Sequence, residues 1–484
     1  MPRFRHAAFR KAARAVYENG EFEPAMLRDE RVRGLIDETN RVLSSALAVS
    51  HETPPELTAA LRNNVFVFSG LKAYHSLAEL GLSLTNDDGS TRSWADFYND
   101  VKAVDGRYNG NYLYAEYNHA VHSAQMAVKW HDWEKDGDEY DLQYRTAGDE
   151  RVREAHRRLD GVTLPPGDKF WNRYLPPNGW NCRCNVVQVL RGEYPRSDSD
   201  AVTAIGDEYT RDLKAQMFRF NAGKTLTIYP EKHPYYKAPK QVKEVIREMS
   251  EELRTPQQAV EFINASEGRR AWFERGFESL ISTTKRGVNG YTDMKGLIAM
   301  TKERLENVLS GLTKLRQGKE ISFDEADALA TFWHEITHNR SKPGYAHMTK
   351  LQTQYMELAN EFVARKTLPE FYEGVGAKMQ HPGFMDDRQS TGYNSMVRNY
   401  CNLITKTKAE PAAVLERVKK HLFEEPYDNQ AEGLVKALQE HGAQKPDGSK
   451  MKLSEIKKAV KLCVEYDYSE KLFDKNLQTL LVTE

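Results

Sequence analysis

Two histidines stand four residues apart in the stretch TFWHEITHN, residues 331–339, and a glutamate directly follows the first of them. On an α-helix, residues four apart lie one turn apart on the same face. His334 and His338 can therefore present two imidazoles to one zinc ion. Glu335 lies beside them, where a carboxylate can take a proton from a water that the metal polarises. The spacing predicts a zinc-dependent hydrolytic site, with Zn²⁺ as the cofactor.

The flanking residues predict that this motif lies on a helix. Ser322 and Glu325 fit the S-x-x-E pattern of a capping box, which satisfies the first backbone N–H groups of a helix. Asn339, followed by Pro343 and Gly344, is typical of a helix end. We therefore expect both histidines on one face of a helix that begins near residue 322.

A second predicted helix, residues 350–368, offers the third ligand. Its Glu357 and Glu361 are four residues apart, and two like charges stacked in this way destabilise a helix by about 0.2–0.5 kcal/mol unless a cation lies nearby. The order HExxH, a loop, and a helix containing NEFVA resembles the gluzincin class of zinc peptidases over residues 322–366. The resemblance implies that Glu361 is the third ligand, with Glu357 as the alternative or as a residue that orients the ligands.

Other interpretations of this region stay open. His334 and His338 can be polar residues on a solvated helix face, with Glu335 pairing with Arg340, or they can hold a zinc ion that is purely structural. If the site is catalytic, its substrate is a peptide or a protein. Two residues further along the chain are candidates for hydrogen-bond donors to a transition state: Tyr393 and His381.

A second group of possible metal ligands lies in the stretch FWNRYLPPNGWNCRC, residues 170–184. Cys182 and Cys184 are two residues apart, and in a strand such residues face the same side. Together with His156 they can hold a soft metal, although a structural zinc site has four ligands. The alternative is that both cysteines are small buried packing residues.

The same stretch belongs to a longer resemblance, over YRTAGDERVREAHRRLDGVTLPPGDKFWNRYLPPNGWNCRCNVVQV, residues 144–189. It resembles the signature of the Mu F-like phage head-morphogenesis (minor capsid) family. The shared elements are Arg151, His156, Leu159–Gly161, Pro176–Pro177, Trp180 and Cys182-Arg183-Cys184. Residues 108–130 also resemble the long helix of that family, so the resemblance covers about residues 1–190. It implies a minor head protein that associates with the portal and other head proteins, first in the bacterial host cytoplasm and then in the virion head.

Bulk composition narrows the function classes. The net charge of the 484 residues is −1, so a direct role in binding nucleic acid or an anionic membrane is not indicated, and DNA contact is expected only indirectly. No apolar run approaches the roughly 18–20 residues of a membrane span, and the basic N-terminus lacks the apolar core of a secretory signal. Four cysteines are too few for a disulfide framework.

The patterns predict a predominantly helical α+β chain of two domains. A Mu F-like domain covers residues 1–225, a proline-containing connector covers residues 226–242, and a gluzincin-like domain with a small sheet covers residues 243–484. A short helix over 147–161 and four strands are also expected, the strands at 140–146, 186–190, 280–284 and 296–300. Three functions follow: a minor head protein that carries a zinc peptidase, a prophage toxin or effector whose front domain is a packaging module, and a structural head protein with a vestigial HExxH.

Overall fold

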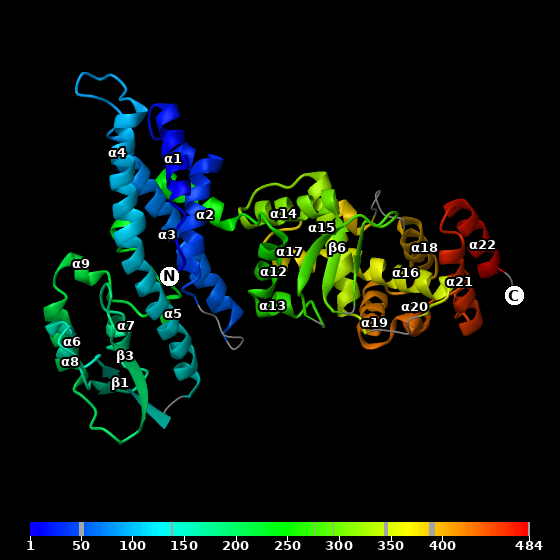
Figure 1. Cartoon of the computed structure of the whole chain (residues 1–484). Coiled ribbons are helices and arrows are strands. Elements are labelled where there is room, and N and C mark those ends of the chain that lie inside the picture. The colour runs from blue at the N-terminus through cyan, green and yellow to red at the C-terminus, as the bar shows by residue number, and fades with distance from the viewer. Residues whose placement is uncertain are drawn as a thin grey trace. The chain divides into compact units, whose positions relative to one another are not determined.

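Helices form most of the computed structural model, and two three-stranded sheets accompany them. The predicted α+β class with predominant helix is confirmed. The chain divides into unit 1, Met1–Ser250, and unit 2, Glu251–Glu484, which are coloured blue to green and green to red in Figure 1. The structure describes residues 1–47, 53–136, 139–274, 276–293, 295–342, 347–386 and 393–482.

Long helices pack side by side in the first part of unit 1. Two of them begin at residues whose side chains accept a backbone N–H of the first turn, Asp29 and Ser93. Phe9, Leu35 and Phe68 lie in their shared buried core. The elements are α1 (His6–Asn19), η1 (Pro24–Arg28), α2 (Glu30–Ser44), α3 (Pro55–Gly81), α4 (Trp94–Asp105), the π-helical turn η2 (Gly106–Tyr112) and α5 (Leu113–Asp136).

The remainder of unit 1 contains an antiparallel sheet of order β2-β1-β3. Leu142 pairs with Leu164 and Tyr144 pairs with Val186, and these side chains share a core with Trp130 of α5. The elements are β1 (Tyr140–Arg145), α6 (Glu154–Arg157), β2 (Thr163–Leu164), α7 (Trp171–Tyr174), β3 (Asn185–Leu190), α8 (Ser199–Tyr209), α9 (Leu213–Gln216), α10 (Ala222–Thr225), η4 (Pro234–Tyr236) and α11 (Lys240–Glu251).

The segment expected to be a connector, residues 226–242, packs within unit 1. Ile228 and Tyr229 are buried in the helical core, and the Tyr229 ring stacks on Phe68 with centroids 3.6 Å apart. The prolines of this segment interrupt regular helix, but its aromatic side chains are held by the helices.

Unit 2 begins with α12 and α13 and a sheet of order β4-β6-β5. Strand β4 is parallel to β6, and β5 is antiparallel to it at the edge of the sheet. The elements up to the long helices are α12 (Pro256–Asn264), α13 (Glu267–Arg270), β4 (Ser279–Thr283), β5 (Gly290–Thr292), β6 (Leu297–Thr301) and α14 (Lys302–Arg316).

Helix α15 (Phe323–Arg340) lies in the middle of the sheet-bearing part of unit 2, where it contacts α14, α16, α17, β5 and β6. Ser322 and Glu325 form the predicted capping box. Two hydrogen bonds fix α15 against the next segment: Asn360 Nδ2 donates to His334 O at 3.1 Å, and Trp333 Nε1 donates to Thr367 Oγ1 at 3.1 Å. These contacts set which side of α15 faces α16.

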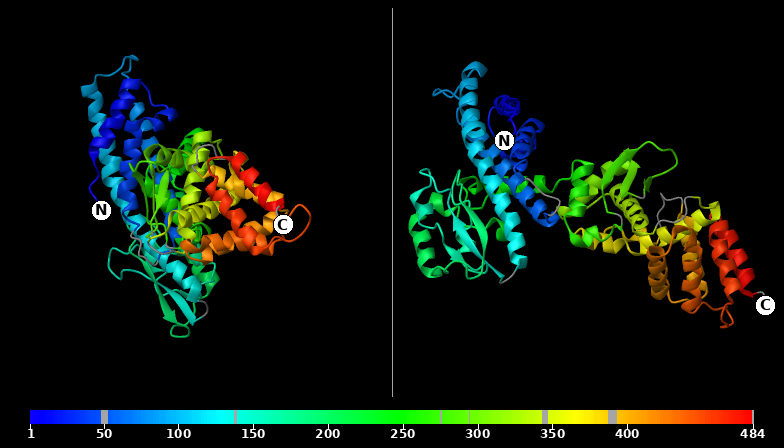
Figure 2. Two further views of the ribbon diagram at one scale, coloured as in Figure 1. Left: turned by 90° about the vertical axis from the view of Figure 1, so that its right-hand side faces the viewer. Right: turned by 60° about the horizontal axis from the view of Figure 1, so that its bottom comes forward.

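The rest of unit 2 is helical. Its C-terminal helices gather at the end of the unit away from the sheet (Figure 2) and enclose a core that includes Tyr400, Leu434 and Cys463. The elements are α16 (Lys350–Lys366), α17 (Leu368–Gly374), η5 (Pro382–Met385), α18 (Asn394–Lys406), α19 (Pro411–Glu424), η6 (Tyr427–Asn429), α20 (Gln430–Glu440), α21 (Leu453–Glu465) and α22 (Glu470–Val482). Within the described parts of the chain, no helix combines the length and the apolar character that crossing a membrane requires.

Candidate metal centres

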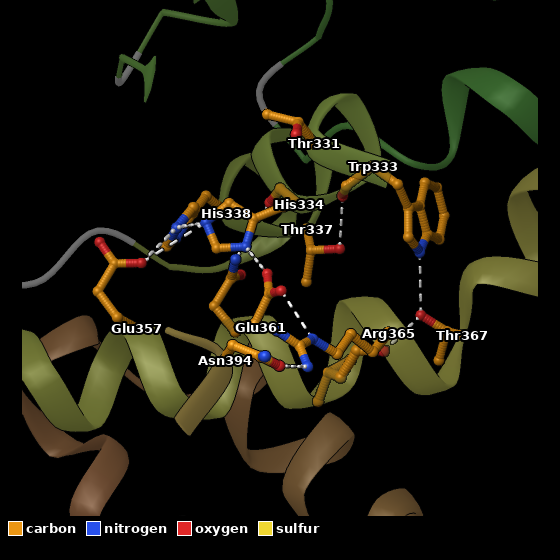
Figure 3. A network of polar contacts seen from close by, with 12 residues as sticks. Thr331, Trp333, His334, Thr337, His338, Glu357, Glu361, Arg365, Thr367 and Asn394 are labelled. Atoms are coloured by element: carbon orange, nitrogen blue, oxygen red, sulfur yellow. Dashed lines mark hydrogen bonds and ion pairs between the residues drawn. The ribbon is translucent and has the colours of Figure 1, made fainter. Parts of the chain in front are cut away.

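Helices α15 and α16 bring together three side-chain atoms that could bind a metal ion in unit 2 (Figure 3). The Nε2 atoms of His334 and His338 lie 3.0 Å apart. Glu357 Oε2 lies 3.3 Å from Nε2 of His338 and 3.5 Å from Nε2 of His334. That oxygen is buried and receives no well-formed hydrogen bond from any residue that the structure describes, so a cation at this position would satisfy it.

These spacings fit a tetrahedral zinc ion. Zinc binds imidazole nitrogen and carboxylate oxygen at about 2.0–2.2 Å, so two ligand atoms of a tetrahedral site are about 3.3–3.5 Å apart. The three observed separations run from 3.0 to 3.5 Å. The donor set of two imidazoles and one carboxylate is also one that zinc accepts in sites that leave a fourth position open.

Glu361 faces the other nitrogen of His334. Its Oε2 lies 2.6 Å from His334 Nδ1, while its Oε1 accepts a hydrogen bond from Arg365 Nε at 2.8 Å. Because a carboxylate accepts, Nδ1 of His334 carries a proton, and Nε2 is the nitrogen that can bind a metal beside His338 and Glu357 once it has lost its own proton. The resemblance implied Glu361 as the third ligand, with Glu357 as the alternative. In the structure Glu357 Oε2 lies beside both Nε2 atoms, whereas Glu361 faces Nδ1 of His334.

Burial excludes the interpretation of this motif as a solvated helix face. The exposed fractions of His334, His338 and Glu335 are 7%, 7% and 5%. Glu335 was expected to pair with Arg340 in that interpretation, but the Arg340 guanidinium lies over the ring of Phe423, 4.3 Å from its centroid.

The electrostatics of the cluster favour a bound cation. Burial lowers the pKa of His334, but the carboxylates of Glu357 and Glu361 outweigh burial and raise it to about 10. Burial also lifts the pKa of Glu335 above its usual range, although His334 and His338 oppose this. A site that holds a proton so firmly has an excess of negative charge, which a metal ion can neutralise.

A cavity of about 550 Å³ opens onto the three ligand atoms. Glu335 and Glu361 also line it, and one wall is the segment that runs into strand β5, with Lys285 and residues 287–292. Gly290 of β5 lies so close that a Cβ there would be 3.0 Å from Glu335 Oε1.

The two expected transition-state donors have different positions. Tyr393 lines the cavity, and its ring stacks parallel to that of His334 with centroids 6.0 Å apart. His381 is not among the lining residues, because its Nε2 bonds Ile321 O at 3.1 Å and its ring contacts Phe323 and Phe384. No motif pointed to Tyr427, which lines the cavity and donates a hydrogen bond to His338 O.

The second predicted group also comes together, in unit 1. Nδ1 of His156 lies 3.6 Å from Cys182 Sγ and 3.4 Å from Cys184 Sγ, and all three residues are buried. A hydrogen bond from Cys184 lowers the pKa of Cys182 to about 4 against the opposing effect of burial, and the same hydrogen bond, together with burial, raises the pKa of Cys184.

Comparison with known proteins finds a family match for the region that contains this second group. Residues 89–187 match the family model described as "Phage Mu protein F like protein". A segment of 44 residues is 48% identical to the "Putative capsid assembly protein F" of Escherichia phage Mu. This match covers 9% of the chain and 10% of that relative. No solved structure matches the chain.

The Mu F-like resemblance is therefore confirmed for residues 89–187. It identifies this region as similar to a phage head-morphogenesis family. For residues 1–88 the resemblance stays a prediction, and so does the gluzincin resemblance of unit 2.

Proposed function

We propose that this chain is a minor head protein of a phage or prophage and that unit 2 is a zinc-dependent peptidase. The match of residues 89–187 to the Mu F-like family supports the first part, as does the similarity to a protein whose printed name is a putative capsid assembly protein. In this role the chain associates with the portal and other head proteins, in the bacterial cytoplasm during assembly and then in the virion head.

One observation carries the peptidase half of the proposal: three ligand atoms at tetrahedral spacing face a cavity that Glu335 also lines. Nε2 of His334, Nε2 of His338 and Oε2 of Glu357 would hold the metal. When bound, zinc supplies Lewis acidity, which polarises a peptide carbonyl and makes water a better nucleophile at neutral pH.

The remaining roles belong to side chains around these ligands. Glu335 accepts the proton of the attacking water, and its raised pKa brings it nearer to the operating pH, where a general base works best. Glu361 holds His334 in the correct tautomer through Nδ1, and Arg365 in turn holds Glu361. Tyr393 lies where a hydroxyl can donate to the oxygen that gains charge.

The substrate that suits this cavity is an extended peptide. Strand β5 is at the edge of the β4-β6-β5 sheet, and the segment around it, residues 287–292, forms a wall of the cavity. An extended peptide can add to a sheet edge through main-chain hydrogen bonds, which would bring its backbone past Glu335.

The test uses the full chain, zinc analysis and a general substrate, fluorescently labelled casein. We expect one zinc bound by unit 2 and cleavage of casein by the wild type. Glu335→Gln should keep that zinc and lower the cleavage rate by about 100-fold or more, which is the usual contribution of a general base. Asp324→Asn is a matched control, because it neutralises an exposed carboxylate of the same helix and should leave the rate unchanged.

Each alternative function predicts a different outcome of this experiment. Zinc bound without any Glu335-dependent cleavage would indicate a structural metal site and contradict the peptidase. No zinc in unit 2 would leave a structural head protein with a vestigial motif. Growth arrest on expression in bacteria that Glu335→Gln relieves would instead favour the toxin or effector.

A further inference from the structure

We propose that unit 1 carries a second metal site of a different kind, in which Cys182 Sγ, Cys184 Sγ and His156 Nδ1 bind one zinc ion. The site lies in the region that matches the Mu F-like family. It shares no residue with the candidate peptidase site, and it does not depend on that proposal.

The distances around His156 fit zinc. With Zn–S bonds of about 2.3 Å and Zn–N bonds of about 2.0–2.1 Å, a sulfur and a nitrogen of one tetrahedral site are about 3.5–3.6 Å apart. The observed separations are 3.6 Å to Cys182 Sγ and 3.4 Å to Cys184 Sγ. One lone pair on Nδ1 accepts one good thiol hydrogen bond, so the nearly equal approach of two sulfurs to a single nitrogen is better explained by a cation between the three atoms.

The second nitrogen of His156 is arranged as in metal-binding histidines. Nε2 lies 3.3 Å from the carbonyl oxygen of Asn178. Because a carbonyl only accepts, Nε2 carries the proton, and Nδ1 is left unprotonated toward the sulfurs. Packing alone gives no reason for this orientation, since two small buried cysteines need no nitrogen aimed at both of them.

The backbone that carries the cysteines is held from two sides. Cys182 N donates to Gly179 O at 3.2 Å, and Cys182 O lies 2.6 Å from Nδ1 of His122 on α5. The ligands are thus fixed by an ordered loop, which lowers the entropy lost on binding a metal.

The fourth position suits a water molecule. Among the residues that the structure describes, the ligand group consists of His156, Cys182 and Cys184. A cavity of about 60 Å³ lies beside it, lined also by Arg151, Arg153 and Asn181. This volume accommodates about one or two waters. Two thiolates and one Zn²⁺ are neutral together, so the buried site leaves no net charge to be solvated.

A zinc ion here would join three segments of unit 1. His156 belongs to α6 (Glu154–Arg157), the cysteines follow the proline-containing loop, and β3 begins at Asn185, directly after Cys184. The metal would therefore fasten the loop and α6 to the sheet, and its binding energy would add to the stability of this part of the protein.

Cobalt spectroscopy of the full chain tests the proposal, because sulfur ligands give Co²⁺ an intense near-ultraviolet charge-transfer absorption that nitrogen and oxygen ligands do not give. The protein is reduced, stripped of metal and titrated with Co²⁺. We expect the band to saturate and to disappear when excess Zn²⁺ is added. In His334→Ala, which disables the candidate site of unit 2, it should saturate at one Co²⁺ per chain. It should be retained in His334→Ala and lost in Cys182→Ser.

A matched control is Cys401→Ser, which removes a free cysteine of unit 2 and should leave the band unchanged. If Cys182→Ser fails to fold, His156→Cys takes its place, and we expect it to retain the metal with a stronger band, since a third sulfur joins the site. Absence of the band in folded, reduced wild type would overturn the proposal, and so would a band that Cys182→Ser leaves intact. Because the readout requires sulfur, failure of the peptidase site would not change it.

Discussion

Glu357 and Glu361 stand four residues apart on α16 and face different nitrogens of the same imidazole. Glu357 lies beside Nε2 of His334, where it also reaches His338, whereas Glu361 bonds Nδ1 and is held by Arg365. The nitrogen that a carboxylate faces decides whether it can be a ligand or only orient one. The two glutamates are chemically alike, so this difference comes entirely from their positions.

The positions predict different effects of two matched substitutions on zinc affinity. Glu361→Gln removes a partner that orients His334 and should weaken zinc binding by about 10–100-fold. Glu357→Gln removes a ligand and should weaken it more. Competition with a chelator of known affinity measures both dissociation constants, and circular dichroism checks that each variant folds. A larger loss in Glu361→Gln would restore Glu361 as the third ligand.

The sequence identified the motif but could not decide between Glu361 and Glu357 as the third ligand, for a physical reason. Residues four apart on a helix lie on the same face, so spacing alone cannot separate Glu357 from Glu361. The choice depends on Arg365, which occupies one of the two carboxylates, and on the rotation of α16 about its axis, which tertiary contacts set. The three residues of the unit 1 cluster were easier to find, because cysteines are rare in this chain.

Among the elements of unit 2, strand β5 brings the backbone of the sheet close to Glu335, the proposed general base. A Cβ at Gly290 would lie 3.0 Å from Glu335 Oε1 and 3.2 Å from Ala299 O. The glycine thus leaves the space that the Glu335 carboxylate occupies, and a larger residue must displace either that side chain or the strand.

Gly290→Ala should therefore lower kcat/KM for a peptide substrate by about 10–100-fold, since small displacements of a catalytic group are costly. Zinc content should not change, because Gly290 is no ligand. Gly383→Ala is the control, as a Cβ there meets nothing within 4 Å. Equal activity of the two variants would mean that the approach of β5 to Glu335 has no role in catalysis.

How well the elements could be predicted depends on the strength of their local signals. Helix α15 has a capping box at its start, and the strands β1, β3, β4 and β6 lie within a residue of their predicted ranges. Strand β5 was missed because its three residues give no alternating pattern. The helix expected over 147–161 shrinks to α6 (Glu154–Arg157), since Gly148 adopts a left-handed φ of 69° and Arg183 holds the side chain of Asp149.

For the whole molecule, the glutamates around His334 make the stability of the metal-free protein depend on pH. The pKa of His334 is raised from 6.5 to about 10 in the folded state. The stability that its protonation contributes is therefore fully present below about pH 6.5 and is lost as pH rises to about 10. Burial also raises the pKa of Glu335, which acts in the same direction.

Urea unfolding in the presence of a chelator should show this loss. Between pH 6.5 and 9.5 the free energy of unfolding of the wild type should fall by on the order of a few kcal/mol more than that of His334→Gln, since one pKa unit corresponds to about 1.4 kcal/mol. The same slope in both proteins would show that His334 is not held in its charged form by the neighbouring carboxylates.

The functional proposals for the two units rest on different kinds of support. The family match and the cysteine cluster both lie in unit 1, where an ordered signature of unusual residues made the resemblance specific. The HExxH motif lies in unit 2, where the support is geometric: two helices, one capping box and three atoms at the spacing of a metal site. The proposed zinc site of unit 2 therefore needs a direct observation of the metal.

That observation is a crystal structure of the zinc-loaded full chain with anomalous diffraction recorded at the zinc absorption edge. We expect an anomalous peak in unit 2 about 2.0–2.2 Å from Nε2 of His334, Nε2 of His338 and Oε2 of Glu357, with Glu361 on Nδ1 of His334. Absence of a peak between α15 and α16, or a peak bound by Glu361 in place of Glu357, would contradict the proposed site.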